Sequence, residues 1–176
     1  MIDSGNGGLY YLKSLQRSDT DYILIMDKAF FPYGEKSKEF LLKRSLYLCY
    51  VLKNQGAERI ILACNTLSLI ALPFLKLFFT EVSGVFQEFL PYLTKNSAIL
   101  GSKKTIALLK TQYPDNLLID GSRLISKIEH RLDTSEEVAE INRMIKGREN
   151  IILACTHFLG LSDNAFVIPQ IKNKVK

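Results

Sequence analysis

One short segment occurs twice in this chain, and this repeat constrains the fold more than any other feature. Residues 58–64 read ERIILAC and residues 149–155 read ENIILAC, so six of seven positions are identical at an offset of 91 residues. A single offset near half of the chain length predicts two related halves rather than a solenoid of many repeats. Coincidence is the alternative, because strands rich in isoleucine and leucine resemble one another. The match extends beyond the strand into cysteine and a hydroxyl residue, which favours a true repeat.

Short apolar runs alternate with longer amphipathic stretches along the whole chain. Five runs bounded by polar residues or glycine predict buried strands, and Val82–Val85 is a candidate sixth. The five are Tyr22–Met26, Arg59–Ala63, Ser97–Leu100, Asn116–Ile119 and Asn150–Ala154. Helices are expected between them, at about Lys36–Gln55, Thr66–Phe79, Ser102–Lys110, Ser122–Arg131 and Thr134–Lys146. Strands that alternate with helices indicate βαβ units and a mostly parallel sheet.

The repeat and the alternation together predict an α/β fold of two pseudo-symmetric lobes, each a mostly parallel sheet flanked by helices. Residues 1–88 would form the first lobe, which carries Cys64, and residues 89–176 the second, which carries Cys155. The chain has 176 residues, of which 47% are hydrophobic and 23% charged. This length suits one large or two small domains, and this composition suits an ordinary globular core.

Both copies of the repeat place a cysteine where a buried strand ends and a helix is expected to begin. A helix N-terminus offers free backbone N–H groups and the positive end of the helix dipole. These groups lower the pKa of a thiol and can hold a substrate carboxylate. Free cysteines are often just small buried hydrophobic residues, but the equivalent placement of Cys64 and Cys155 beside polar residues favours a function. Cys49 lies inside an expected helix, in SLYLCYVL, and is interpreted as core packing.

Two glycine-containing segments are weaker candidates for a ligand site. Asp3–Gly8 reads DSGNGG, and its glycines allow a tight turn and a close approach of backbone to a ligand, while Asp3 and Ser4 bring a carboxylate and a hydroxyl. Neither a GxGxxG fingerprint nor a GxxxxGK[ST] phosphate loop is present. Phe31–Gly34 reads FPYG, which predicts a turn by composition. Taken alone, each segment could be an ordinary loop.

Composition argues against several classes of protein. No apolar run is long enough to cross a bilayer without charges, and the start MIDSGNGGL lacks the features of a signal peptide. We therefore expect a cytoplasmic protein without a membrane partner. Three cysteines with no CxxC pair, and only two histidines, predict neither a disulfide framework nor a metal site.

The net charge of +5 raises the question of a nucleic-acid partner. The basic residues are scattered, and the densest groups are Lys103–Lys104 and the tail lysines Lys172, Lys174 and Lys176. Neither group is interleaved with aromatic residues as a platform for single strands would be. A solvated surface is the preferred interpretation, so no nucleic-acid partner is expected, and attraction of small anionic substrates remains compatible.

Four motifs in order resemble those of glutamate racemase, a member of the wider aspartate/glutamate racemase superfamily. They are DSGNGGL at Asp3–Leu9, PYGEKS at Pro32–Ser37, ACNT at Ala63–Thr66 and ACTHF at Ala154–Phe158, and ILGSKKTI at Ile99–Ile106 is similar to a further element of the family. The resemblance covers most of the chain. It implies an active site in the cleft between the lobes and racemisation of glutamate without a cofactor. It also implies a supply of D-glutamate for peptidoglycan, and a homodimer is compatible with it.

The resemblance also implies roles for particular residues. Cys64 and Cys155 would be the two acid/base residues, with Asp3 and His157 assisting them as catalytic residues. The residues that would bind the substrate are Ser4, Pro32, Tyr33, Gly34, Asn65, Thr66, Ser102, Thr105 and Thr156. Glu129, in LISKIEH, resembles an acidic residue near the second cysteine of the family. No metal is implied.

The chain departs from the family pattern at both ends and in one motif. It begins almost at the Asp-Ser motif and ends soon after the second cysteine motif, where family members continue and return to the first lobe. Gly101–Ser102 stands where Ala-Thr is more usual. A piece of a longer protein, a racemase of aspartate or another small amino acid, and an inactive paralogue that binds an amino acid or a protein all stay open. Missing end segments would expose apolar surface and sheet edge.

Overall fold

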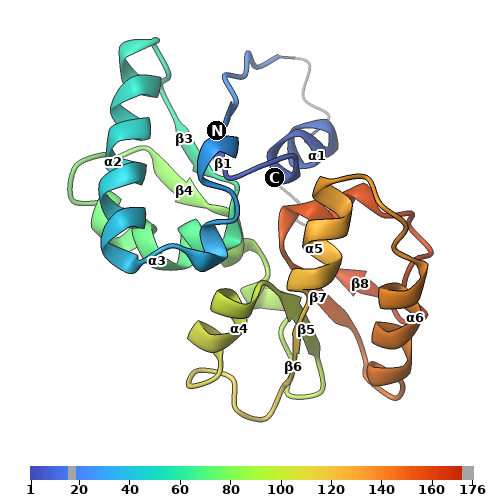
Figure 1. Ribbon diagram of the computed structural model, residues 1–176. Helices are drawn as coiled ribbons and strands as arrows, with labels where there is room; N and C mark the ends of the chain where they lie inside the picture. The colour runs from blue at the N-terminus through green and yellow to red at the C-terminus, as the bar shows by residue number, and fades with distance from the viewer. Residues whose placement is uncertain (16–18, 172–176) are drawn as a thin grey trace.

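The computed structural model describes residues 1–15 and 19–171, and their strands form two four-stranded sheets (Figure 1). The first sheet has the order β2-β1-β3-β4, with strands Ile25–Met26, Ile2–Asp3, Ile60–Leu62 and Val82–Gly84. The second has the order β6-β5-β7-β8, with strands Leu117–Asp120, Ala98–Gly101, Ile151–Ala154 and Gln170–Ile171. The tail lysines Lys172, Lys174 and Lys176 lie outside the described residues.

The two sheets have the same topology. Every strand pair in residues 1–15 and 19–171 is parallel. The repeated isoleucine-rich segments form β3 and β7, and each lies third in its sheet, beside the strand that opens its half of the chain. The sequence repeat is therefore a repeat of structure. The predicted α/β class, with two mostly parallel sheets flanked by helices, is confirmed.

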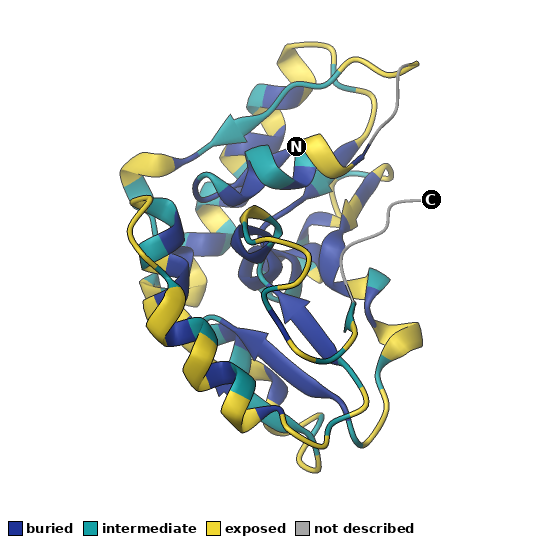
Figure 2. Ribbon diagram, turned by 90° about the vertical axis from the view of Figure 1, so that its right-hand side faces the viewer, coloured by how far each residue is buried: buried dark blue, intermediate teal, exposed yellow. Residues whose placement is uncertain are grey.

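Helices pack on both faces of each sheet, as parallel sheets require. The α-helices are α1 (Gly7–Ser14), α2 (Lys38–Asn54), α3 (Asn65–Leu75), α4 (Lys103–Leu109), α5 (Ser122–Glu129) and α6 (Ser135–Met144). The 3-10 helices are η1 (Lys28–Phe30), η2 (Tyr33–Glu35), η3 (Val85–Glu88), η4 (Leu90–Tyr92) and η5 (Thr156–Gly160). The two central strands of the second sheet, β5 and β7, are buried, whereas the helices around them carry exposed outer sides (Figure 2). Within the described part of the chain, no helix is long and apolar enough to cross a membrane.

Serine side chains begin two of these helices in the same way. The Ser37 hydroxyl accepts a hydrogen bond from the backbone N–H of Phe40 at 3.1 Å, at the start of α2. The Ser102 hydroxyl accepts one from the N–H of Thr105 at 3.3 Å, at the start of α4. Serine is a preferred N-cap because its oxygen satisfies an N–H that has no partner in the helix. Ser102 is thereby held at the end of β5.

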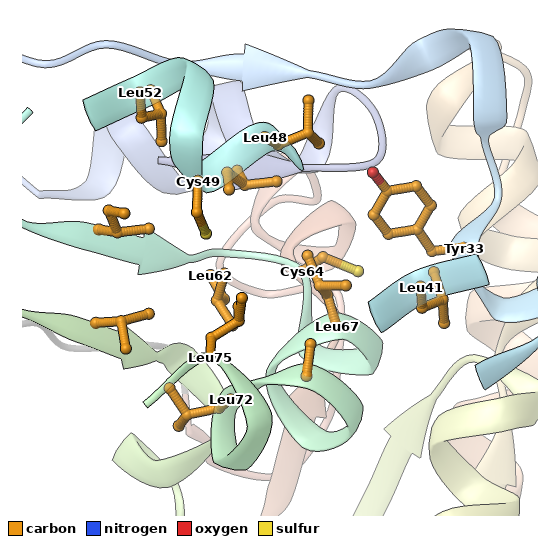
Figure 3. Close-up of a cluster of buried hydrophobic side chains, with 14 residues drawn as sticks. Tyr33, Leu41, Leu48, Cys49, Leu52, Leu62, Cys64, Leu67, Leu72 and Leu75 are labelled. Carbon is orange, nitrogen blue, oxygen red and sulfur yellow. The ribbon is translucent and has the colours of Figure 1, made fainter. Parts of the chain in front are cut away.

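The core of the first half lies between its sheet and helices α2 and α3 (Figure 3). Cys49 is fully buried in this cluster with Leu48 and Leu52 of its own helix, so its interpretation as core packing is confirmed. Cys64 belongs to the same cluster but lies at its edge, on the side of Tyr33. The two cysteines therefore have different surroundings although both are buried.

Two segments that follow strand ends form helices in the structure. Asp3–Gly8 is not only a turn, because α1 begins at Gly7. Adjacent glycines are poor helix formers, yet a Cβ on Gly7 would lie 2.4 Å from Thr156 Oγ1, so this position needs glycine for its contact with the second half of the chain. After Cys155 the expected helix is the short 3-10 helix η5.

Candidate active site

Four strand ends bring the predicted site residues together. Asp3 and Cys64 stand at the carboxyl ends of β1 and β3, the two central strands of the first sheet. Ser102 and Cys155 stand at the same ends of β5 and β7 in the second sheet. In each sheet the chain order reverses between these two strands, and such a switch point is where open parallel sheets bind ligands.

The second thiol is part of a chain of polar contacts. Cys155 is half-buried, and its Sγ lies 3.5 Å from Nδ1 of His157. The other ring nitrogen of His157, Nε2, lies 2.8 Å from Oε2 of Glu129 at the end of α5. His157 is 2% exposed, so its ring is fixed between the sulfur and the carboxylate. The sequence resemblance to an acidic residue near the second cysteine thus fits the position of Glu129.

The electrostatic surroundings keep His157 protonated at neutral pH. Burial alone would lower its pKa, but Cys155, Glu129 and Asp3 outweigh burial and raise the pKa to about 10. Burial likewise works to raise the pKa of Glu129, but His157 and the backbone N–H of Asn6 outweigh it, so this pKa lies below its usual value. An imidazolium donates from both nitrogens. His157 can therefore donate from Nδ1 to the Cys155 sulfur and from Nε2 to Glu129.

Asp3 connects the two halves of the site. Its Oδ1 accepts a hydrogen bond from the N–H of Gly5, and its Oδ2 accepts one from the hydroxyl of Thr156, both at 2.9 Å. Burial raises the pKa of Asp3, while the charge on His157 and these two donors oppose the shift. The carboxylate also acts on Cys64, whose pKa it raises. One buried acid therefore influences the surroundings of both thiols.

Cys64 is more deeply buried than Cys155. It precedes α3 as the N-cap residue and is 8% exposed. Burial and the charge of Asp3 raise the pKa of the Cys64 thiol, although hydrogen bonds with the N–H of Leu67 and the side chain of Ser4 oppose the shift. The prediction that a helix N-terminus lowers the thiol pKa is wrong here, because burial outweighs it. Cys155 also contributes to the raised pKa of Cys64.

Three hydroxyl groups from the two halves of the chain meet beside Cys64. Thr66 Oγ1 lies 3.0 Å from Ser102 Oγ and 2.9 Å from Thr105 Oγ1. Thr66 follows the first cysteine, whereas Ser102 and Thr105 belong to the start of α4. Gly34 faces the same cluster, since a Cβ built on it would lie 3.3 Å from Ser102 Oγ. These four predicted substrate-binding residues are therefore neighbours.

Asn65 has the most distinctive surroundings of the predicted binding residues. Its side chain is buried, with 2% of the residue exposed, and neither its amide nitrogen nor its amide oxygen has a hydrogen-bond partner. Buried polar groups in proteins are nearly always paired, because leaving one unpaired costs about 1–3 kcal/mol. An unpaired amide directly after Cys64 is therefore free to bind a ligand.

A buried carboxylate, that of Asp27, holds the side chain of Tyr33 in place. Tyr33 donates a hydrogen bond from Oη to Asp27 Oδ2 at 2.5 Å, and Arg44 binds both oxygens of Asp27 at 2.9 and 2.6 Å. Burial works to raise the pKa of Asp27, but Arg44 and Tyr33 outweigh it and hold it below its usual value. Burial, Asp27 and Cys64 raise the pKa of Tyr33, which therefore stays neutral near the thiol. Pro32 precedes Tyr33 as the N-cap of η2.

Sequence reasoning missed three residues that these contacts single out. Asp27 and Arg44 pair across 17 positions of sequence, and a single acidic and a single basic residue at that spacing carry no motif. Asn6 lies inside the recognised Asp3–Leu9 motif, where only the flanking Asp, Ser and glycines drew attention. Within residues 1–15 and 19–171, no group of three or more His, Cys, Asp and Glu residues is placed to hold a metal ion.

Solved structures contain the same fold. Glutamate racemase from Campylobacter jejuni subsp. jejuni superposes with a TM-score of 0.73, covering 91% of this chain and 72% of that chain at 28% sequence identity. The architecture of two parallel sheets flanked by helices is therefore that of the aspartate/glutamate racemase superfamily.

Sequence relatives narrow this class to one family. Glutamate racemase from Vibrio cholerae serotype O1 is 31% identical over 178 residues, which are 90% of this chain and 67% of that protein. Glutamate racemase from Buchnera aphidicola subsp. Schizaphis graminum is 33% identical over 183 residues, which are 90% of this chain and 71% of that protein. No model of a protein family matches the chain. The chain belongs to the glutamate racemase family, whose members are isomerases.

Proposed function

We propose that this protein interconverts L- and D-glutamate without a cofactor, with Cys64 and Cys155 acting on opposite faces of the α-carbon. The substrate is inferred from the relatives, which are glutamate racemases. The observation that supports the mechanism is that the two thiols have different surroundings. Cys64 is a buried, neutral thiol, whereas Cys155 lies beside a protonated His157.

The proposed reaction needs one base and one acid. The α-proton of an amino acid is very weakly acidic, so its removal needs a base in contact with it and stabilisation of the carbanion that forms. Cys155, as the thiolate, takes the α-proton, and the electrons of the Cα–H bond move toward the carboxylate. The Cys64 thiol then donates its proton to the opposite face of the carbon. The reverse reaction exchanges the two roles.

Binding of the amino acid is assigned to the polar residues that follow the strands. Asn65 would use its unpaired amide, and the start of α3 would direct its backbone N–H groups at the substrate carboxylate. Donors placed where charge develops typically stabilise a transition state by about 3 kcal/mol each. Thr66, Ser102 and Thr105 would bind the rest of the substrate from the other side of the cluster.

The proposal includes the arrangement of the two lobes. Residues 1–88 and residues 89–176 would be separate lobes with the active site in the cleft between them. Phe86 and Phe89 pack with Ile99 of the second sheet, which supports a junction at this point of the chain. The proposed role in the cell is the supply of D-glutamate for peptidoglycan synthesis in the cytoplasm, by a protein able to form a homodimer.

A direct assay tests the proposed function. The purified chain is incubated separately with L-glutamate, D-glutamate and L-aspartate, and both enantiomers are measured over time by chiral chromatography. We expect inversion of both glutamate enantiomers and a much slower reaction of aspartate. Preference for aspartate would assign a different substrate. A thermal shift with glutamate but no inversion would identify a binding protein and overturn the proposed activity.

A further inference from the structure

Asn6 makes two hydrogen bonds to one residue in the other half of the chain. Its backbone N–H donates to Oε2 of Glu129 at 2.7 Å, and its side-chain amide Nδ2 donates to the main-chain oxygen of Glu129 at 3.2 Å. The two residues are 123 positions apart in sequence. Asn6 therefore holds Glu129 at both its carboxylate and its backbone.

The side chain of Asn6 makes this contact instead of capping its own helix. Asn6 is the N-cap residue of α1, and asparagine at this position normally accepts a hydrogen bond from an N–H of its own helix. Here the side chain makes no such bond. Glu129 is the last residue of α5, and the final carbonyls of a helix lack partners within it. The Asn6 amide therefore caps the end of α5 instead of the start of α1.

Glu129 in turn orients His157. The same oxygen that accepts from Asn6, Oε2, lies 2.8 Å from Nε2 of His157, and the Glu129 side chain is 9% exposed. Gly5 allows this close approach, because a Cβ there would lie 2.8 Å from Oε2. The carboxylate is thus fixed between Asn6 and His157, and it fixes which way the Nδ1 side of the ring points.

We propose that Asn6 is a positioning residue for the Cys155–His157 pair, an inference that rests on the proposed function. Asn6 acts through Glu129: its side chain fixes the main chain at the end of α5, and its backbone N–H binds the carboxylate that holds the imidazolium, so that Nδ1–H points at the Cys155 sulfur. Proton transfer at the Cys155 face depends on this alignment. Proton transfer at the Cys64 face does not, because the surroundings of Cys64 come from other residues.

The test compares Asn6→Ala with a matched variant, Asn142→Ala. Asn142 has the same amide chemistry in the second half, donating to the oxygen of Ala165 at 2.9 Å and accepting from the N–H of Val167 at 2.8 Å. Within the described residues, no hydrogen bond joins Asn142 to Glu129 or His157. Asn6→Ser is the second variant. Serine keeps a polar side chain and the backbone N–H bond to Oε2 but is too short to reach the main-chain oxygen of Glu129, so it keeps the test valid if Asn6→Ala fails to fold.

The first readout does not depend on activity. Nuclear magnetic resonance titration of the imidazole of His157 in the full chain measures its pKa, which is about 10 in the intact protein. Both variants lose the side-chain bond to the Glu129 main-chain oxygen and keep the backbone N–H bond to Oε2. The end of α5 is then less firmly held and the carboxylate lies less closely on the ring, so we expect Asn6→Ala and Asn6→Ser to lower the pKa of His157. Asn142→Ala should leave the pKa unchanged. An unchanged His157 titration in folded Asn6 variants overturns the proposal.

The second readout compares racemisation that starts from L-glutamate with racemisation that starts from D-glutamate. The primary isotope effect is measured with α-deuterated L- and D-glutamate. Because the two enantiomers have equal free energy, kcat/KM must fall equally in both directions, by about tenfold. The isotope effect should rise for the enantiomer that Cys155 deprotonates and fall for the other. Equal changes for both enantiomers, or the same changes in Asn142→Ala, would assign Asn6 a structural role only. Absence of racemisation in the unmodified chain would instead refute the proposed function, and the titration alone would then decide the role of Asn6.

Discussion

The carboxylate of Asp3 accepts a hydrogen bond from the hydroxyl of Thr156 at 2.9 Å, across 153 positions of sequence. Asp3 ends β1 in the first sheet, and Thr156 follows β7 in the second. Both residues are buried, with 1% of each exposed. This contact joins the two copies of the fold at their strand ends, where the two thiols also lie.

Removing the Thr156 hydroxyl should harm both stability and activity. In Thr156→Val the side chain keeps its shape, but Asp3 Oδ2 loses its donor in a buried position. We expect the free energy of unfolding to fall by about 2 kcal/mol and racemisation to slow by about tenfold or more. Denaturation in urea and initial rates measure the two effects. Thr156→Ser keeps the hydroxyl and should stay close to the parent, and equal behaviour of the two variants would refute the role of this bond.

Asn65→Ala should separate stability from function. The Asn65 amide has no partner in the folded protein, so its removal relieves a buried unpaired group. We expect a melting temperature equal to or above that of the parent, together with a loss of kcat/KM of about 100-fold.

Thr66→Val is the matched comparison for Asn65→Ala. The Thr66 hydroxyl is hydrogen-bonded to Ser102 and Thr105, so its loss should lower the melting temperature as well as the activity. A marked loss of stability in Asn65→Ala, with activity retained, would show that this amide has a structural partner and does not bind substrate.

The three cysteines should react with an alkylating agent in a fixed order. Cys155 is half-buried and lies beside an imidazolium, whereas Cys49 and Cys64 are buried and have raised pKa values. Reactivity follows exposure and thiolate character. We expect iodoacetamide to modify Cys155 first, and the other two only as the protein unfolds, as measured by mass spectrometry of digested samples. Modification of Cys49 before Cys155 would contradict the surroundings described here.

Glu88 should make stability depend on pH near neutrality. Burial raises its pKa to about 7, although the hydroxyl of Tyr11 opposes the shift. A carboxyl whose pKa is higher in the folded than in the unfolded state contributes stability at low pH, and this contribution is lost as pH rises from about 4.5 through about 7. Glu88→Gln should therefore be more stable than the parent at pH 8, and less different at pH 4.5. A constant difference in melting temperature across this range would contradict the shifted pKa.

Sequence patterns predicted β2 to β7 and helices α2 to α6, but not β1, β8 or α1. The apolar runs gave the strands because parallel strands are buried on both faces, and the repeat marked β3 and β7 as equivalent. The limits of each element were less well defined. The run Tyr22–Met26 pairs only at Ile25–Met26. Helix α1 begins at two glycines, of which Gly7 packs against η5 and Gly8 against Asp3. Such contacts join distant parts of the chain and leave no local pattern.

The candidate site, like the fold, could be predicted from the sequence only in part. Motifs identified Cys64, Cys155 and the polar residues that follow them, because each lies at a strand end. The buried Asp27–Arg44 pair and the Asn6–Glu129 contacts could not be read from spacing, since each partner is a single polar residue at an irregular separation. The raised pKa of Cys64 was also missed, because burial depends on the packed structure.

The central claim is that two thiols act on opposite faces of one carbon, and α-proton exchange in heavy water tests it most directly. L- or D-glutamate is added to the protein in D2O, and proton resonance follows the α-position of substrate and product from the first turnovers. Two bases predict that the product carries deuterium at once while the remaining substrate keeps its proton, and that Cys64→Ser and Cys155→Ser each abolish inversion. Early exchange into the substrate at the rate of inversion, or inversion that survives both substitutions, would contradict the account.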